Sequence, residues 1–201
     1  GMGLTETSPT LFLTDEEHAL SKAGSVGKPV LHTSIRVVDE EGNDLPVGAI
    51  GELWAKGPNV TPGYWERPEA NAESFTDGWL HTGDAARIDE DGYVYIVDRW
   101  KDMYISGGEN VYPAEVEQLL FRHENVLDVA VIGVPDERWG ESGLAVIVPR
   151  DASAFDPADI IHFCDDKLAR YKIPKRAVAV DELPRNAAGK ILKRQLREEL
   201  A

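Results

Sequence analysis

One segment in the middle of the chain, residues 98–113, constrains the fold more than any other, because it places two adjacent glycines between a strand-like run and a helix start. The run that leads into it, residues 93–98, alternates in the manner of a β-strand. Gly107 and Gly108 then precede Pro113, which stands at the first position of an amphipathic pattern. Paired glycines beside a helix start allow a close approach of the backbone to a bulky neighbour. Taken alone, the segment predicts a β-hairpin with a glycine turn, followed by a helix.

The stretch before this segment, residues 33–98, is predicted to be rich in β-strands. Residues 33–39 form a β-branched run, residues 51–56 alternate, and an Asp-Gly pair at 91–92 marks a hairpin. A proline opens residues 68–75, which favour a short helix. We expect a small barrel or a twisted sheet that packs against a larger domain.

The stretch after the glycines predicts a compact α+β lobe with the order helix, strand, strand, helix, strand and then a last helix. The first helix carries an apolar face on which His123 takes a structural place. Asp156 and Pro157 are typical of an N-cap and a first turn. Cys164 falls on the apolar face that follows, so we interpret it as a core residue and not as a nucleophile. The predicted elements are residues 114–123, 126–134, 143–148, 157–168, 177–180 and 191–200.

The composition excludes several classes of protein. The chain has 201 residues, 42% of them hydrophobic and 28% charged, which is enough to bury one large core or two small ones. A net charge of −15 argues against binding nucleic acid over the whole surface. The single cysteine excludes internal disulfides and fits a reducing cytoplasm, where we expect the protein to act. No apolar run is long enough to span a membrane.

The charge is unevenly distributed along the chain. Residues 1–98 contain 18 acidic and 6 basic side chains, whereas residues 167–201 contain 10 basic and 4 acidic ones. A basic end on an acidic protein commonly serves solubility alone, but it can also present cations to a polyphosphate.

The first residues form a small, hydroxyl-rich loop with one carboxylate. It is not a dinucleotide fingerprint, because Glu6 occupies the third glycine position and no strand precedes it. The Thr5 hydroxyl and the Glu6 carboxylate suit a nucleotide phosphate and its Mg²⁺, since carboxylate oxygen is a ligand that this ion prefers. On composition alone, a plain surface loop is the commoner explanation.

Two further residues stand out, each with a simpler alternative. Asp84 closes a Thr-Gly-Asp turn, where an Asx-turn is common, but its carboxylate can also accept hydrogen bonds from two ribose hydroxyls. Lys190 follows Gly189 on a polar loop that is not a Walker loop, because Pro184 and Ile191 occupy two of the defining positions. A lone lysine is usually solvated surface. The five histidines are scattered without metal-ligand spacing.

Five sequence blocks nevertheless follow one another in an order that is typical of one enzyme family: residues 1–6, 51–65, 78–84, 98–117 and 184–190. They resemble the adenylate-forming, AMP-binding enzymes, most closely the acyl-CoA synthetases, and among these the fatty-acid–CoA ligases. The resemblance covers nearly the whole chain, and it implies an enzyme that uses ATP and Mg²⁺ to activate a carboxylic acid as acyl-AMP before transfer to CoA.

The resemblance also implies roles for the candidate residues. Thr5 would face the ATP phosphates and Glu6 would bind Mg²⁺. Asp84 would accept hydrogen bonds from both ribose hydroxyls, and Arg99 would contact the same sugar. Lys190 matches the catalytic lysine of the family, which also binds the nucleotide.

A second set of implied roles concerns movement. Lys101 matches the hinge residue about which the C-terminal lobe turns between the two half-reactions. That turn would expose Gly107 and Gly108, which would line a passage for the pantetheine arm of CoA. Two positions depart from the pattern. Met2 stands where the family usually has an aromatic residue on adenine, and Ile105 stands where plant hydroxycinnamate ligases tend to carry lysine, which argues against that subgroup.

The resemblance divides the chain into the end of a large AMP-binding domain (residues 1–98), a hinge (99–101) and a mobile C-terminal lobe (102–201). The implied fold class is α+β, with a β-rich, barrel-like subdomain followed by a lobe that contains a three-stranded sheet. The rest of the large domain, including most of the carboxylate pocket, would precede Gly1, so we expect the chain alone to be inactive. A fatty acid is the first expected substrate and an aryl acid the second.

Two other functions fit parts of the sequence. One is an adenylation domain that loads a carrier protein, although residues 107–111 and 192–197 resemble CoA ligases better. The other is a non-catalytic module that binds a nucleotide or CoA. An assay with free CoA against a carrier protein separates the first alternative, and activity of the complete protein separates the second.

Overall fold

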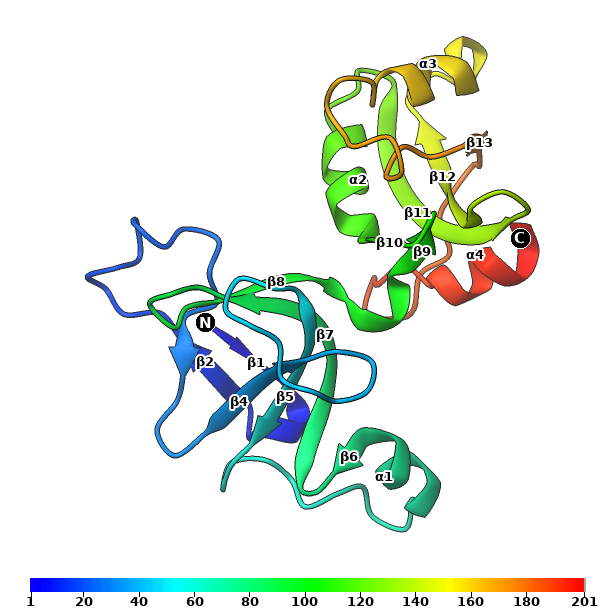
Figure 1. Ribbon diagram of the computed structural model, residues 1–201. Coiled ribbons are helices and arrows are strands. Elements are labelled where there is room, and N and C mark those ends of the chain that lie inside the picture. The colour runs from blue at the N-terminus through cyan, green and yellow to red at the C-terminus, as the bar shows by residue number, and fades with distance from the viewer. Residues whose placement is uncertain (201) are drawn as a thin grey trace. The chain divides into compact units, whose positions relative to one another are not determined.

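The structure is a computed structural model that describes residues 1–200, and it shows the α+β fold class that the sequence predicted (Figure 1). The chain forms two compact units, Gly1–Lys101 and Asp102–Ala201. Within residues 1–200, no helix has the length and apolar character needed to cross a membrane.

The first unit is built on an open, antiparallel five-stranded sheet in the order β4-β5-β7-β6, with β8 also paired to β7. Because the sheet does not close on itself, the twisted-sheet expectation holds and the barrel expectation does not. A short helix, α1 (Pro68–Ser74), begins at the predicted proline. The strands are β4 (Ser34–Val38), β5 (Gly51–Lys56), β6 (Phe75–Thr76), β7 (Trp79–Ile88) and β8 (Val94–Arg99).

A second, three-stranded sheet is formed by the start of the chain, in the order β1 (Met2–Gly3), β2 (Thr10–Leu13) and β3 (Lys28–Pro29). A bridge between Gly27 and Val94 connects this region with β8. One apolar core serves both sheets, because it contains residues of β2, β4, β5, β7 and β8. Its fully buried members are Leu11, Phe12, Leu53, Ala55, Ala86 and Val94.

The predicted turn at Thr82–Asp84 is wrong, because β7 continues through it as a strand. Glu52 pairs with Ala85 and Trp54 pairs with His81, so the three residues from Thr82 to Asp84 lie opposite the single residue Leu53. Gly83 accommodates this bulge with a φ of 70°, a conformation that favours glycine. The Thr-Gly-Asp pattern therefore encodes a bulge that bends the strand and does not end it.

The second unit contains a five-stranded sheet in the order β10-β9-β12-β11, with β13 parallel to β12. Three of the strands are those expected from the sequence. The glycine hairpin adds two more, because Ser106 of β9 pairs with Gly140 of β12. The strands are β9 (Tyr104–Ser106), β10 (Glu109–Val111), β11 (Val126–Asp136), β12 (Gly140–Pro149) and β13 (Arg176–Ala179).

Helices cover both faces of the second sheet, and alternation along β11 explains why. Val129 and Val131 belong to one apolar cluster with α2 (Pro113–Leu120) and α3 (Pro157–His162), whereas Ala130 and Ile132 belong to another with α4 (Lys193–Leu200). Successive residues of a strand point to opposite faces, so a continuous apolar run implies a sheet buried on both sides. Three 3₁₀ turns complete the chain: η1 (Thr5–Thr7), η2 (Trp100–Asp102) and η3 (Ala152–Ala154).

The predicted start of α3 is confirmed by its capping contact. The Asp156 carboxylate accepts a hydrogen bond from the Ala158 amide at 2.9 Å, with Pro157 in the first turn. The helix ends at His162, earlier than the apolar pattern suggested. Cys164 is fully buried in the core, and burial raises the pKa of its thiol to about 11, which supports the structural interpretation.

Tyr104 anchors the hairpin to the sheet through a slot made by two glycines. Gly133 and Gly143 face each other on β11 and β12, and a Cβ atom at either position would strike the Tyr104 side chain. At Gly143, that atom would lie 2.5 Å from the Tyr104 hydroxyl oxygen. Within residues 1–200, this buried hydroxyl has no hydrogen-bond partner. The slot therefore packs tightly against the Tyr104 ring but offers no hydrogen-bond partner to its hydroxyl group.

Gly143→Ala should lower the free energy of unfolding by about 1–3 kcal/mol through overpacking. In a Tyr104→Phe background the cost should shrink, because the next contacts of the new methyl group lie at 3.3 and 3.4 Å. Gly133→Ala is the matched control, since its methyl group would meet Tyr104 Cβ, which phenylalanine retains. Urea unfolding of Tyr104→Phe, and of each glycine variant with and without Tyr104→Phe, measures this coupling, and an equal cost of Gly143→Ala in both backgrounds would contradict the slot.

Candidate active-site residues

Asp84 and Arg99 form an ion pair on neighbouring strands of the first unit. They are paired positions of β7 and β8, and Arg99 Nη1 donates to Asp84 Oδ1 at 2.8 Å. The Asp84 side chain is 4% exposed, whereas the Arg99 side chain is 46% exposed. A buried carboxylate requires such a cation, since an unpaired charge is costly away from water. The pair thus leaves the Arg99 guanidinium half-exposed to solvent beside a buried carboxylate.

The bulge in β7 sets the position of Asp84. The Thr82 hydroxyl donates to the Leu53 carbonyl at 2.7 Å, and the Asp84 amide donates to the Thr82 hydroxyl at 3.2 Å. These two bonds replace part of the regular ladder where three residues oppose one. Bulges of this kind often redirect a side chain beside a functional site.

Thr5 and Glu6 are adjacent on η1, where Thr5 is exposed and Glu6 is half-buried. The Tyr64 hydroxyl donates to Glu6 Oε1 at 2.9 Å, and the Thr61 amide donates to the Glu6 carbonyl at 2.8 Å. Burial and the neighbouring Glu6 carboxylate raise the pKa of Tyr64. The sequence pattern included Tyr64 only within residues 51–65 and did not predict this contact with Glu6.

Glu6 is suited to bind a hydrated Mg²⁺ ion with one carboxylate. Magnesium in nucleotide sites commonly uses one or two carboxylates, waters and the substrate phosphates, so a dedicated protein cage is not required. In the described residues, no group of three or more His, Cys, Asp or Glu side chains could hold a metal ion. The arrangement fits an ion that arrives with a nucleotide.

Lys101 lies exposed in η2, and the boundary between the two compact units falls directly after it. The next residue, Asp102, is anchored within the second unit, because Arg197 of α4 binds its Oδ1 atom at 3.1 Å. The structure thus fixes the residue that follows Lys101 to the second unit. The hinge role of Lys101 stays a prediction.

Gly107 and Gly108 form the two-residue turn between β9 and β10, since Ser106 pairs with Glu109. Both have positive φ values, 63° and 87°, as a type I′ turn requires. A Cβ atom at Gly107 would lie 2.5 Å from the Trp139 ring, while one at Gly108 would meet nothing within 4 Å. Turn geometry therefore accounts for both glycines, and their role toward CoA stays a prediction.

Lys190 lies at the end of a short loop that precedes α4, in the second unit. The Asn186 side chain accepts hydrogen bonds from the amides of Ala188 and Lys190 at 3.0 and 2.9 Å, and the Asn186 amide donates to the Lys190 carbonyl at 2.9 Å. Gly189 has a φ of 82°. The Lys190 side chain is exposed, and within residues 1–200 its ammonium has no hydrogen bond or ion pair. An exposed ammonium group thus projects from a hydrogen-bonded loop.

The structure brings one pair of predicted residues into contact, Asp84 with Arg99, and places Thr5 beside Glu6. The Gly107–Gly108 turn and the loop of Lys190 are separate segments of the second unit.

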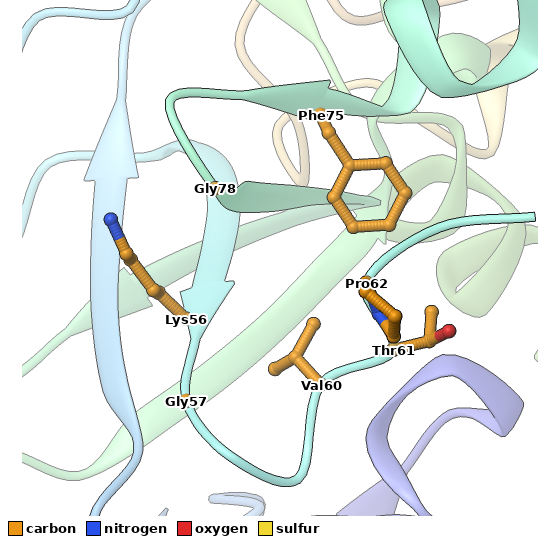
Figure 2. Close-up of a pocket in the computed structure, with 7 residues that line it drawn as sticks. All are labelled: Lys56, Gly57, Val60, Thr61, Pro62, Phe75 and Gly78. Carbon is orange, nitrogen blue, oxygen red and sulfur yellow. The ribbon is translucent and has the colours of Figure 1, made fainter. Parts of the chain in front are cut away.

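A pocket of about 360 Å³ in the first unit contains none of the predicted site residues (Figure 2). Apolar side chains form most of its lining, and the Lys56 ammonium is engaged by the Asp77 carbonyl at 2.8 Å. The pocket adjoins the Glu6 region through Thr61, whose amide donates to the Glu6 carbonyl, and through Phe75, whose ring contacts that of Tyr64. Its lining is Lys56, Gly57, Val60, Thr61, Pro62, Phe75 and Gly78.

Comparison with known proteins finds curated relatives that match almost the whole chain. A feruloyl-CoA synthase of Amycolatopsis sp is 49% identical over 98% of this chain and 40% of its own length. A 2-succinylbenzoate–CoA ligase of Bacillus cereus strain AH820 is 44% identical over 98% of this chain and 40% of its own length. The chain therefore spans about 40% of the length of the curated relatives it matches.

Solved structures give the same picture. An o-succinylbenzoate CoA synthetase of Bacillus subtilis, in complex with its acyl-adenylate intermediate, matches with a TM-score of 0.87 and 39% identity over 97% of this chain and 40% of its own. The ATP-bound MatB of Rhodopseudomonas palustris matches with a TM-score of 0.79 and 46% identity over 88% of this chain and 35% of its own. These likenesses agree with the α+β architecture described above.

Family patterns match both ends of the chain. The pattern of AMP-binding enzymes matches residues 1–65, and the pattern of the AMP-binding enzyme C-terminal domain matches residues 115–190. Together they cover most of the chain, and they agree with acyl-CoA ligases among the relatives. The chain belongs to the AMP-binding enzyme superfamily.

Proposed function

We propose that this chain is the C-terminal part of an ATP-dependent carboxylate–CoA ligase. The observation that carries the proposal is the exposed Lys190 on its hydrogen-bonded loop, in a different compact unit from the buried Asp84 and its partner Arg99. The curated relatives support it, because they are named as CoA ligases or synthases. Residues 1–98 then belong to the large domain, residues 99–101 are the hinge and residues 102–201 the mobile lobe.

The first half-reaction needs a cation near the α-phosphate. The substrate carboxylate attacks that phosphorus, the bond to the leaving pyrophosphate breaks, and negative charge builds on the phosphoryl oxygens. A fixed positive group placed there lowers the barrier, and Lys190 supplies an ammonium group on a long stem. Asp84 would bind the ribose hydroxyls, and Arg99, its ion-pair partner, would contact the same sugar.

Thr5 and Glu6 would act at the other end of the nucleotide. The Thr5 hydroxyl would donate to a phosphate oxygen, and Glu6 would bind Mg²⁺, which neutralises phosphate charge when it is bound. The Tyr64 hydroxyl donates to Oε1 of Glu6, and this hydrogen bond also fixes the orientation of Oε2, because the carboxylate is planar. Tyr64 thereby orients the carboxylate for the ion.

The second half-reaction needs a different arrangement, because the CoA thiol must reach the acyl carbonyl. Rotation of the second unit about Lys101 would withdraw Lys190 and admit the pantetheine arm past Gly107 and Gly108. A hinge requires only a few residues that absorb backbone rotation. The anchoring of Asp102 to Arg197 would limit that rotation to residues before Asp102.

For the acid substrate, we propose an aromatic carboxylate in place of the fatty acid expected first. Relatives named for feruloyl and 2-succinylbenzoate substrates favour this choice, which was the second expectation. Ile105 argued only against the subgroup of plant hydroxycinnamate ligases, and a feruloyl-CoA synthase of Amycolatopsis is 49% identical to this chain.

The complete protein tests the proposal with ATP, Mg²⁺ and CoA. Pyrophosphate release and thioester formation should be faster with ferulate or 2-succinylbenzoate than with a medium-chain fatty acid. Preference for the fatty acid would restore the first expectation. Transfer to a carrier protein in place of CoA would identify the adenylation-domain alternative, and nucleotide binding without turnover would identify the non-catalytic module.

In the complete protein, Lys190→Ala should slow acyl-adenylate formation by about 10²–10³-fold, because one preorganised charge is lost at the transition state. Thioester formation from supplied acyl adenylate should change by less than about 3-fold. Lys167→Ala, which removes the same charge from the second unit, is the matched control. Equal loss of both half-reactions would argue against separate roles for the two orientations.

Lys101→Pro should spare adenylate formation and slow thioester formation, which is the opposite of the effect expected for Lys190→Ala. Proline fixes φ at its own position and disfavours the helical conformation of the residue before it, here Trp100 in η2. Lys101→Ala is the control, since it removes the side chain but leaves the backbone free to rotate. Rapid-quench measurement of each half-reaction decides, and an unchanged overall rate for Lys101→Pro would show that the pivot lies elsewhere.

A further inference from the structure

Arg185 connects the Lys190 loop with the body of the second unit. Its Nη1 atom donates to the Gly189 carbonyl at 2.6 Å, and its Nη2 atom binds the Asp128 carboxylate on β11. The two contacts use different nitrogen atoms of one planar guanidinium. The residue next to Lys190 is therefore tied through a rigid fork to a strand of the central sheet.

Other contacts of the loop act within the loop itself. Asn186 binds the amides of Ala188 and Lys190, so it fixes the local turn but not the place of that turn on the sheet. Beyond the loop, Lys193 binds Glu117 at 2.7 Å, and the same Glu117 oxygen accepts a hydrogen bond from the Val131 amide. The segment is thus anchored before Lys190 by Arg185 and after it by Lys193.

This anchoring matters because the lysine stem is long and flexible. The position of an ammonium group depends on the position of its Cα atom, and a displacement of about 1 Å can reduce a rate by about 10²-fold. A lysine at position 185 could not replace the fork, because one ammonium cannot present two coplanar donors to a carbonyl and a carboxylate.

We propose that Arg185 is a positioning residue for the adenylation step, which holds the Lys190 loop in place through its contacts with Gly189 and Asp128. The inference rests on the proposed function of Lys190. Arg185 itself need not touch the nucleotide. Its side chain is 43% exposed and that of Asp128 24% exposed, and ion pairs this close to solvent contribute little to stability. Loss of Arg185 should therefore leave the second unit folded.

The experiment compares three variants of the complete protein: Arg185→Ala, Arg185→Lys and Arg194→Ala. Arg194 is the matched control, because it has the same charge in the same tail but pairs only with Glu198 of its own helix in the described structure. Adenylate formation should fall by about 10–10²-fold in both Arg185 variants and by less than about 2-fold in Arg194→Ala. Thioester formation from supplied acyl adenylate should stay within about 3-fold of the parent.

A second readout does not depend on activity. Hydrogen exchange of residues 186–190, followed by mass spectrometry without nucleotide, should become faster in the two Arg185 variants and stay unchanged in Arg194→Ala. Unchanged exchange, or an unchanged adenylation rate, in Arg185→Ala would overturn the inference, and so would full rescue by lysine. If Lys190→Ala itself leaves adenylation intact, the proposed function fails instead, so the two failures are distinguishable.

Discussion

The antiparallel pairing of β11 with β12 is the interaction on which the second unit depends. Ten residue pairs join the two strands, from Val126–Pro149 to Asp136–Gly140, and their side chains alternate between two apolar cores. Because both faces of these strands are buried, the helices pack on a rigid sheet, α2 and α3 on one face and α4 on the other. The glycine hairpin contacts the same two strands through Tyr104. The Lys190 loop inherits that rigidity, since Arg185 ties it to Asp128 of β11. The position of the exposed Lys190 can thus depend on the β11–β12 pairing, although Lys190 itself is in neither strand.

Local signals predicted the elements whose causes are local. The bounds of β5 agree with the alternating run at 51–56, and α3 begins at the Asp-Pro pair that caps it. The features that escaped prediction depend on distant partners. The bulge at Asp84 exists because three residues of β7 lie opposite Leu53 of β5, and the predicted hairpin joins the larger sheet because Ser106 of β9 pairs with Gly140 of β12. No window of sequence contains such pairings, so a turn was predicted where a strand continues.

The candidate site shows the same division. Its residues could be named because ordered blocks resemble a family, whereas composition and spacing alone favoured a surface loop or a solvated lysine. The supporting contacts were missed for a physical reason: Tyr64 is 58 positions from Glu6, and Arg185 is 57 positions from Asp128. Local patterns show which side chains have suitable chemistry. Which of them are held still is decided by contacts between remote segments, and positioning determines how much of that chemistry is effective.

The uneven charge gives the two-unit arrangement an electrostatic rationale. Residues 1–98 carry 18 acidic and 6 basic side chains, and a polyphosphate bound there would add further negative charge. Cations built permanently into that unit would be neutralised by its own carboxylates, as Lys22 is by Asp89 and Asp91 and Arg36 by Asp44. Lys190 instead belongs to the basic residues 167–201 of the second unit, and within the described residues its ammonium group contacts no carboxylate. In the proposed function, such a cation would not be paired before it met phosphate, and attraction between exposed charges acts over only about 8–10 Å at physiological salt. It would therefore stabilise the adenylation transition state at close range without holding the units together afterwards.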